Sequence, residues 1–351
     1  MASRQSTQSN NRIALKPENL SNIPIMNVYR FPLMLLAIHV GVSSCLLGAE
    51  GNDPFVKIEP PALIGRWDLT VKDGEQVYPS WLEISLSGYR TLVGRYVGQF
   101  GSARPIAQIQ FDAQAGAFAF SLPPQWEKRI SDILFEGRLQ DEGLVGMTTN
   151  DAGQPVSWTA VRAPALGDQP EGKVRWGKRI RLFNGKDLTN WGVRHPDLPN
   201  GWVVQDGHLI NERPGNDLVS IQSFGDFKLN VEFVYPAGSN SGLYLRGRHE
   251  IQIEDNYGMS PDSHLIGGVY GFLTPHLNAA RKAGEWQEME ITLIGQQLTL
   301  KFNGVEIISK QNIPGITGGA LDSREGQPGP LMIQGDHGPI RFRKVDLTPA
   351  R

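Results

Sequence analysis

Cysteine is nearly absent from this sequence. Its only cysteine, Cys45, has no partner for an intrachain disulfide and lies near the N-terminus, so the chain after Ala49 has no thiol nucleophile. Runs of basic residues are absent as well, because 34 Lys and Arg stand against 36 Asp and Glu, a formal net charge of −2. A mildly acidic chain without basic runs is not expected to bind nucleic acid.

Long apolar runs are also lacking. The most apolar segment, Phe31–Val42, is interrupted by His39 and Gly41 and is too short to span a bilayer well. It follows a basic stretch and precedes small residues, so we expect residues 1–49 to be a secretory signal segment, with Met26 as the true start. The protein is therefore expected to be exported, to a periplasmic or extracellular location.

The cysteine belongs to a segment, Val42-Ser43-Ser44-Cys45, that resembles the processing box of bacterial lipoproteins. Two outcomes stay open: lipidation of Cys45 as the first mature residue, or cleavage after Ala49. Contact with a membrane is expected only through the signal segment or this lipid anchor.

Glycine and proline are abundant, with 40 and 24 of the 351 residues. Apolar residues at 40% and charged residues at 20% are ordinary for a globular protein, so the glycine and proline indicate many tight turns. After residue 60 no stretch keeps the 3.6-residue period of a helix over three turns. We therefore predict an all-β protein.

Residues 60–163 form the first predicted domain, a β meander with a turn about every ten residues. Its strand-like runs are Leu63–Val71, Trp81–Leu86, Leu92–Val97, Ile106–Phe111, Ala117–Leu122, Ile133–Leu139, Leu144–Thr148 and Val156–Val161. This pattern predicts a small up-and-down β-barrel or sandwich. The opening Gly65-Arg66-Trp67 and the late Arg162 resemble lipocalin-like barrels. Its expected role is that of a spacer or binding appendage, and a ligand-carrying barrel is the alternative.

Residues 164–178 are a linker rich in proline and glycine, and residues 179–349 form a second β domain. Its predicted strands are Trp202–Ile210, Leu218–Ile221, Phe227–Tyr235, Gly242–Glu254, Gly268–Phe272, Glu288–Ile294, Gln297–Phe302, Leu331–Gln334 and Ile340–Leu347. Eight or nine antiparallel strands in ~170 residues are the size of a two-sheet jelly roll.

One predicted strand, Gly242–Glu254, divides its side chains into two faces of opposite character. Successive side chains of a strand point to opposite faces, and most odd positions here are apolar. The even positions form a polar row: Tyr244, Arg246, Arg248, Glu250, Gln252 and Glu254. Such a row is typical of a sheet that grips a sugar through planar hydrogen bonds and aromatic stacking. A solvated face with cross-strand ion pairs is the alternative, and Gly247 can mark a bulge that resets the phase.

Nine motif blocks follow one another through this second domain. They are Leu182–Trp191, Asp206–Leu209, Phe224–Leu229, Asn240–Arg246, Glu250–Asp255, Gly268–Gly271, Gly284–Gln287, Phe302–Val305 and Phe342–Val345. In content and order they resemble the 3-keto-disaccharide hydrolase domain family over about residues 180–349. The resemblance implies a concanavalin-like jelly-roll β-sandwich that acts on an oxidised oligosaccharide or glycoside.

The chemistry implied by this resemblance depends on a ketone at C3 of the sugar. The ketone acidifies the C2 proton, a base removes that proton, donors or a cation hold the enolate, and the C1 aglycone leaves before water adds back. We expect Glu250 to act as the base or as a metal ligand, Arg246 to stabilise the oxyanion and His337 to act as the acid. The expected substrate-binding residues are Asn240, Tyr244, Gln252, Tyr270, Trp286 and Gln334, with Tyr270 and Trp286 as stacking walls.

A metal site is left open by the sequence. No H-x-H or H-E-x-x-H motif appears, which leaves a metalloprotease-type zinc site unsupported. A divalent cation held by oxygen ligands is possible through Glu250, Asp255 or Asp336. Asp255 equally fits a turn cap, and Asp-His-Gly at 336–338 equally fits a plain turn.

Three other functions remain open. The segment from Glu250 to Glu254 is similar to the Glu-x-Asp-x-Glu strand of laminarinase-type retaining glycosidases, but Gln252 takes the place of the central Asp. A non-catalytic, lectin-like glycan-binding protein fits the same fold. The first domain could also determine the role, with the second domain docking it to a partner.

Overall fold

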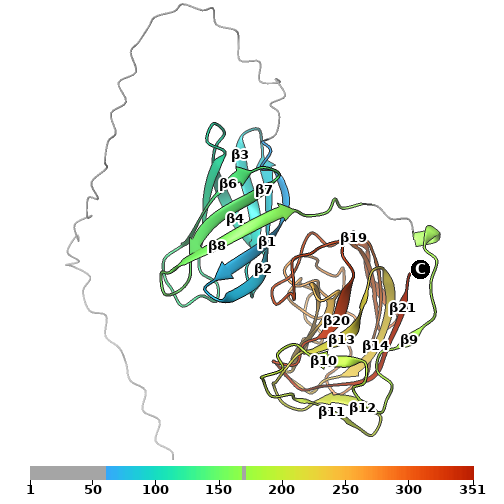
Figure 1. The fold of residues 1–351 in the computed structure, drawn as a ribbon. Helices are drawn as coiled ribbons and strands as arrows, with labels where there is room; N and C mark the ends of the chain where they lie inside the picture. Colours follow the sequence, from blue (N-terminus) through green and yellow to red (C-terminus); the bar gives the residue numbers. More distant parts are fainter. Residues whose placement is uncertain (1–60, 168–170) are drawn as a thin grey trace, which may run out of the picture. The chain divides into compact units, whose positions relative to one another are not determined.

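The computed structural model describes residues 61–167 and 171–351 (Figure 1). The regular elements in these ranges are strands, apart from one short 3-10 turn, η1 (Glu171–Lys173), so the predicted all-β class is confirmed. No helix within these ranges is long and apolar enough to cross a membrane. The predicted signal segment, residues 1–49 with Met26 and Cys45, lies outside the described residues.

The first eight strands close into an antiparallel barrel in sequence order, with β1 paired to both β2 and β8. The predicted up-and-down barrel is thereby confirmed over the sandwich that was its alternative. The strands are β1 (Gly65–Asp73), β2 (Gln76–Ser87), β3 (Thr91–Val97), β4 (Arg104–Asp112), β5 (Ala117–Leu122), β6 (Ile133–Gln140), β7 (Gly143–Thr149) and β8 (Pro155–Arg162).

Aromatic side chains fill the barrel interior. Phe120 and Phe135 stack with centroids 4.8 Å apart, and Phe118 and Trp158 pack at 6.1 Å. A Cβ added at Gly137 would lie 2.6 Å from both Phe118 and Trp158, so the two rings occupy the space that a side chain at this position would need. The interior of the barrel is therefore a packed core.

The remaining strands form two stacked sheets. The smaller sheet has the order β10-β13-β20-β15-β16, and the larger has the order β11-β12-β21-β14-β17-β18-β19, with β9 paired to β21. Their bounds are β9 (Ile180–Arg181), β10 (Trp191–Val193), β11 (Trp202–Gln205), β12 (His208–Asn211), β13 (Leu218–Phe224), β14 (Phe227–Val234), β15 (Asn240–Leu245), β16 (His249–Glu254), β17 (Gln287–Ile294), β18 (Gln297–Phe302), β19 (Val305–Asn312), β20 (Gly329–Ile333) and β21 (Ile340–Pro349).

Three predicted strands differ from the structure because turns interrupt them. Trp202–Ile210 is the hairpin β11–β12, turned at Asp206 and Gly207, which both have positive φ. Gly242–Glu254 is the hairpin β15–β16, and Gly268–Phe272 makes only isolated bridges. Positive φ at Asp206-Gly207 and at Arg246-Gly247 reverses the chain in the two hairpins, and positive φ at Gly267 and Gly271 breaks the third segment, where alternation alone predicted extension.

At β15 and β16 the smaller sheet is covered on both faces, unlike the larger sheet. In β14 of the larger sheet, buried and partly exposed residues alternate strictly from Phe227 to Val234. In β16 of the smaller sheet, every residue except Glu254 is buried. Ile251 and Ile253 enter the common core, so the opposite face of β16 must be covered by other parts of the chain. That second face carries the polar side chains described below.

The barrel packs against the sandwich within one compact unit, Lys57–Arg351. Trp81 and Val97 of the barrel share a small apolar cluster with Ile316 and Ala320 of the sandwich. Trp81 also meets Phe272 edge to face, with ring centroids 5.3 Å apart. The contact is therefore a small hydrophobic core of its own.

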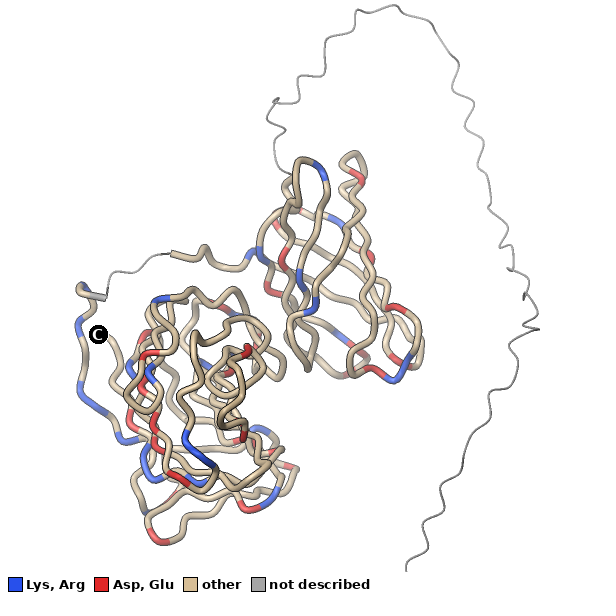
Figure 2. Tube along the Cα trace, turned by 180° about the vertical axis from the view of Figure 1, so that it is seen from behind, with Lys and Arg blue, Asp and Glu red and all other residues tan. Residues whose placement is uncertain are grey.

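Charges of both signs are interspersed over the sandwich (Figure 2). On the outer face of the larger sheet, for example, Arg343 and Lys344 both pair with Glu232. Such mixed ionic ladders are ordinary for a solvated sheet face and indicate no surface of a single sign.

Candidate active site

A pocket of about 300 Å³ lies on the covered face of the smaller sheet. It is lined by residues of β15 and β16 and by residues next to the ends of β10, β13 and β20, so all five strands of this sheet contribute to it. Its lining residues are Phe100, Gly101, Arg194, Asp217, Asn240, Tyr244, Glu250, Gln252, Tyr270, Gly318, Gly319, Gln334, Asp336 and His337.

The β15–β16 hairpin sets the floor of this pocket. Tyr244 pairs with Glu250, and Gly242 pairs with Gln252, so the even-numbered side chains of both strands share one face. Arg246, Gly247 and Arg248 form the turn between them, with φ of 54° and 68° at the first two, and Arg248 donates to Asp322 instead of entering the pocket. The predicted alternation therefore survives within each strand, whereas the residues of the turn leave the row.

Glu250 is the most deeply buried carboxyl group in the pocket, with 5% of its surface exposed. Burial raises the pKa of Glu250 to about 8, although a hydrogen bond with Tyr244 and the charge of His337 oppose this. The Tyr244 hydroxyl donates to the carbonyl of Gly318 at 3.0 Å. Since a hydroxyl has one proton, a protonated Glu250 can donate to Tyr244 while Tyr244 donates to Gly318.

The absence of a side chain at Gly242 makes room for the Glu250 side chain. A Cβ at position 242 would lie 2.4 Å from Glu250 Oε1, so the carboxyl occupies the space that any side chain there would need. The backbone N–H of Glu250 donates to Thr317 Oγ1 at 3.0 Å, which ties β16 to the loop that passes over the pocket.

Arg194 supplies a fixed positive charge. Its guanidinium donates to Asp217 Oδ2 at 3.2 Å, to the carbonyl of Gly319 at 2.9 Å and to the carbonyl of Ala320 at 3.3 Å. Burial raises the pKa of Asp217, but the N–H of Gly335, at 3.0 Å, and Arg194 both favour its ionised form. Three anchors thus hold the guanidinium beside the pocket.

Asp336 and His337 form a close pair at the rim, with Oδ1 and Nδ1 2.5 Å apart. The hydrogen bond that His337 donates to Asp336 raises the pKa of His337, whereas burial opposes the shift. Burial would raise the pKa of Asp336, but its bond to His337 outweighs this and lowers it. The pair therefore favours a protonated imidazole about half-exposed to solvent.

Amides and a tyrosine complete the lining. Gln334 Oε1 is buried without a partner, so a hydroxyl group in the pocket could satisfy it. Gln252 is buried, and its Oε1 accepts from the N–H of Ile253 at 3.2 Å. The side-chain NH₂ group of Gln252 takes no part in that hydrogen bond. Tyr270 packs edge to face with His264 at 5.1 Å, and Asn240 stands at the start of β15.

Eight of the predicted site residues are thus brought into this one pocket: Asn240, Tyr244, Glu250, Gln252, Tyr270, Gln334, Asp336 and His337. Arg246 is not among them. Its guanidinium turns to the β13–β14 connection, where it donates to the carbonyl of Gly225 at 2.8 Å and to Asp226 Oδ1 at 2.9 Å. Arg246 therefore braces the hairpin, and Arg194 takes the place expected of it.

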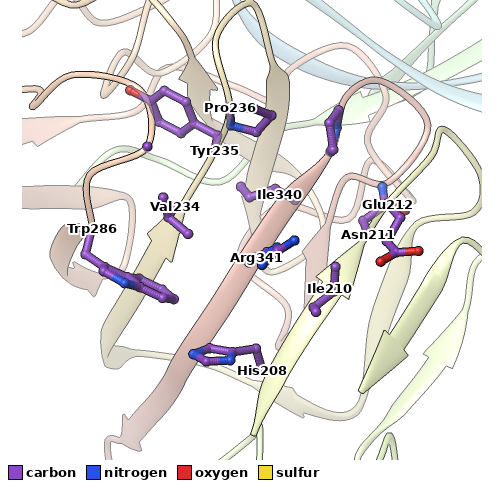
Figure 3. Close-up of a pocket in the computed structure, with 12 residues that line it drawn as sticks. His208, Ile210, Asn211, Glu212, Val234, Tyr235, Pro236, Trp286, Ile340 and Arg341 are labelled. Atoms are coloured by element: carbon purple, nitrogen blue, oxygen red, sulfur yellow. The ribbon is translucent and has the colours of Figure 1, made fainter. Parts of the chain in front are cut away.

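Trp286 lines a different groove, of about 470 Å³, together with His208, Tyr235 and Arg341 (Figure 3). It stacks on His208 at 5.4 Å, and the guanidinium of Arg343 lies 4.3 Å from its ring centre. Residue 286 precedes β17 of the larger sheet, whereas the polar pocket belongs to the smaller sheet. The aromatic wall expected from Trp286 is therefore not part of the polar pocket.

Asp255 lies outside the pocket lining, and its Oδ2 accepts from the N–H of Gly238 at 2.9 Å as a turn cap. Glu254 is likewise not in the lining and accepts from the Asn256 side chain at 3.1 Å. Across the part of the chain that the structure describes, no group of three or more His, Cys, Asp or Glu is placed to hold a metal. The residues present thus show no cluster suited to the divalent cation left open by the sequence.

Six pocket residues were not found from the sequence: Phe100, Gly101, Arg194, Asp217, Gly318 and Gly319. Arg194 follows β10, and Asp217 precedes β13. These two strand ends are brought together by the strand order of the smaller sheet, which the sequence does not reveal. Phe100 and Gly101 come from the first domain. Only the alternation in β10, where Trp191 and Val193 enter the core, points Arg194 to the other face.

Comparison with known proteins places this site in a family. Residues 178–348 match the model of the 3-keto-alpha-glucoside-1,2-lyase-like domain. A 3-keto-disaccharide hydrolase of Bacteroides thetaiotaomicron is 27% identical over 89 residues, which span 22% of this chain and 30% of that protein. These matches support a carbohydrate hydrolase.

Solved structures with partial similarity include two candidate glycosyl hydrolases from Parabacteroides distasonis. One is 27% identical, covering 52% of this chain and 93% of the other, with a TM-score of 0.42. The second is 24% identical, covering 49% and 98%, with a TM-score of 0.39. At these TM-scores the fold assignment rests on the strand topology above. The resemblance predicted from the motif blocks is confirmed: residues 178–348 of this chain match the model of the 3-keto-alpha-glucoside-1,2-lyase-like domain family.

Proposed function

We propose that this domain cleaves 3-keto-glycosides by base-assisted elimination of the C1 leaving group, followed by hydration. One observation carries the proposal. A buried carboxyl group, Glu250, whose burial raises its pKa to about 8, shares a pocket with a fixed guanidinium, Arg194, and with a His–Asp pair. A proton-exchanging group that titrates near neutral pH, a cation and a second proton carrier are what such an elimination needs.

In the first step the Glu250 carboxylate removes the C2 proton and the electron pair moves toward the C3 ketone. Arg194 is suited to stabilise the oxygen that becomes negative, because its anchors hold it beside the pocket without further reorganisation. The C1–O bond then breaks, and the protonated imidazole of His337 gives its proton to the leaving oxygen. The products are the aglycone and a sugar with a C1–C2 double bond.

In the second step water adds across that double bond. His337, now neutral, takes a proton from water while the oxygen attacks C1, and Glu250 returns its proton to C2. Both groups end as they began, and the net reaction is hydrolysis. Gln252, Asn240 and Gln334 line the pocket as amides that can hold sugar hydroxyls, and the partnerless Oε1 of Gln334 is a ready acceptor.

Export of the protein is part of the proposal, supported by the basic, apolar and small-residue pattern of residues 1–49. An oxidised oligosaccharide in the extracytoplasmic space is the corresponding substrate class.

The test is turnover of a synthetic 3-keto-disaccharide by the purified chain, beside the unoxidised disaccharide and beside Glu250→Gln. We expect release of the aglycone from the 3-keto compound only, and a loss of at least about 10³-fold in kcat for Glu250→Gln. Turnover of the unoxidised sugar alone would instead identify an ordinary glycosidase. Binding of both sugars without any product would identify a lectin-like protein.

A further inference from the structure

The barrel contributes a loop to the rim of the pocket. Phe100 and Gly101, between β3 and β4, line the pocket together with Glu250 and Arg194. These two residues lie about 90 positions or more before the other lining residues, yet both belong to the compact unit Lys57–Arg351.

The loop that carries Phe100 and Gly101 lies so close to the sandwich that the packing between them cannot readily change. The N–H of Gly319 donates to the carbonyl of Gln99 at 2.8 Å. A Cβ at Gly318 would lie 2.3 Å from the carbonyl oxygen of Gly101, and one at Gly271 would lie 2.9 Å from the backbone nitrogen of Ala103. Because these contacts involve backbone atoms, they fix the loop relative to the pocket floor.

Phe100 is an exposed aromatic residue at this rim, with 48% of its surface accessible. Trp126, also 44% exposed, meets it edge to face at 5.5 Å, and its indole N–H donates to the carbonyl of Phe100 at 3.1 Å. The ring is therefore braced, although it is not buried. Large aromatic rings held open beside a polar pocket are typical of binding surfaces for a ligand with an apolar ring face.

We infer that Phe100, braced by Trp126, forms the subsite for the leaving group, a second pyranose ring of the substrate. The inference rests on the proposed function above. The polar groups that act on the oxidised ring lie on the floor, and a volume of about 300 Å³ is at the small end for ligand sites. One sugar ring fills such a pocket, so the next ring lies at the mouth, where the aromatic pair stands. The barrel is then a determinant of specificity for the sandwich.

The test compares a 3-keto-disaccharide with the methyl 3-keto-glucoside, which lacks the second ring. Phe100→Ala should raise KM for the disaccharide roughly 3- to 10-fold with little change for the methyl glucoside, as expected for one lost stacking contact. Phe100→Tyr, which keeps the ring, should restore the wild-type ratio of the two KM values. Tyr89→Ala removes another exposed aromatic residue, 71% accessible, from a different barrel turn and should change neither value.

Equal effects of Phe100→Ala on both substrates, or none, would overturn the subsite while leaving the proposed reaction intact. If the wild type turns over neither sugar, the same three variants are titrated with both sugars by calorimetry. Selective weakening of disaccharide binding in Phe100→Ala then supports the subsite although the proposed reaction has failed. Disaccharide binding that Phe100→Ala leaves unchanged, or that is absent in the wild type, overturns it.

Discussion

Replacing Glu250 by Gln should stabilise the fold at alkaline pH while abolishing activity. In the folded protein burial raises the pKa of this carboxyl from 4.5 to about 8. Below pH 4.5 both the folded and the unfolded chain keep the proton, so the ionisation of Glu250 costs no stability there. Between pH 4.5 and 8 the unfolded chain releases the proton and the folded chain retains it. Folding stability conferred at this site is therefore lost as pH rises through that window.

The size of the effect follows from the two pKa values. The difference between 4.5 and about 8 corresponds, at ~1.36 kcal/mol for each tenfold change in proton affinity, to an upper limit of about 5 kcal/mol above pH 8. Water in the open pocket can solvate part of the charge, so we expect an observed gain of about 1–3 kcal/mol for Glu250→Gln at pH 9. Glutamine suits the site because its N–H can replace the O–H of the neutral acid as a donor.

Urea denaturation of the wild type and Glu250→Gln at pH 5, 7 and 9 measures this. The two free energies of unfolding should nearly coincide at pH 5 and diverge progressively to pH 9 in favour of the variant. Glu254→Gln is the matched control on the same strand, because that carboxylate lies outside the pocket lining and bonds to Asn256. It should show no gain that grows with pH. Parallel curves for the wild type and Glu250→Gln, or a variant less stable at pH 9, would refute the reasoning.

Three further outcomes are expected. The kcat/KM of a 3-keto-glycoside should be bell-shaped in pH, with its maximum between about pH 6.5 and 8. The reason is that the reaction needs one proton shared between Glu250, whose pKa is raised to about 8, and His337, whose pKa is raised above 6.5. A kcat/KM that keeps rising with pH would contradict this. Gly242→Ala should lower kcat at least tenfold by displacing the Glu250 carboxyl, with little loss of thermal stability. Arg246→Met should destabilise the fold by about 1–3 kcal/mol in urea while kcat stays within twofold, whereas Arg194→Met should lower kcat about 10²-fold.

Gly225→Ala is the control for the glycine variant. A Cβ there meets nothing within 4 Å, so both activity and thermal stability should remain near those of the wild type. Loss of activity in both glycine variants, or in neither, would show that crowding of Glu250 is not the cause.

Much of the fold could be predicted from alternation and turn residues. The barrel strands and most sandwich strands followed from short apolar runs between glycine and proline turns, since this signal is local. The hairpin at Arg246 and Gly247 was harder, because the residues before and after the turn keep the same parity. The even-numbered row could therefore be predicted, but with two arginines, Arg246 and Arg248, that the turn carries away from it.

The rest of the site depends on contacts that are remote in sequence. Arg194 and Asp217 become neighbours of Glu250 only through the strand order of the smaller sheet, which local patterns do not specify. Phe100 reaches the pocket because glycines at 318 and 271 leave space for a loop of the other domain. Neither kind of packing leaves a periodic signal in the sequence.

Turnover of a 3-keto-glycoside in D₂O tests the proposed elimination most directly. Removal of the C2 proton by Glu250, exchange of that carboxyl proton with solvent while the aglycone leaves, and hydration predict one deuterium at C2 of the released sugar, detected by mass spectrometry and NMR against a parallel incubation without protein. Release of the aglycone with no deuterium at C2 beyond that control would contradict elimination and show direct displacement at C1 instead.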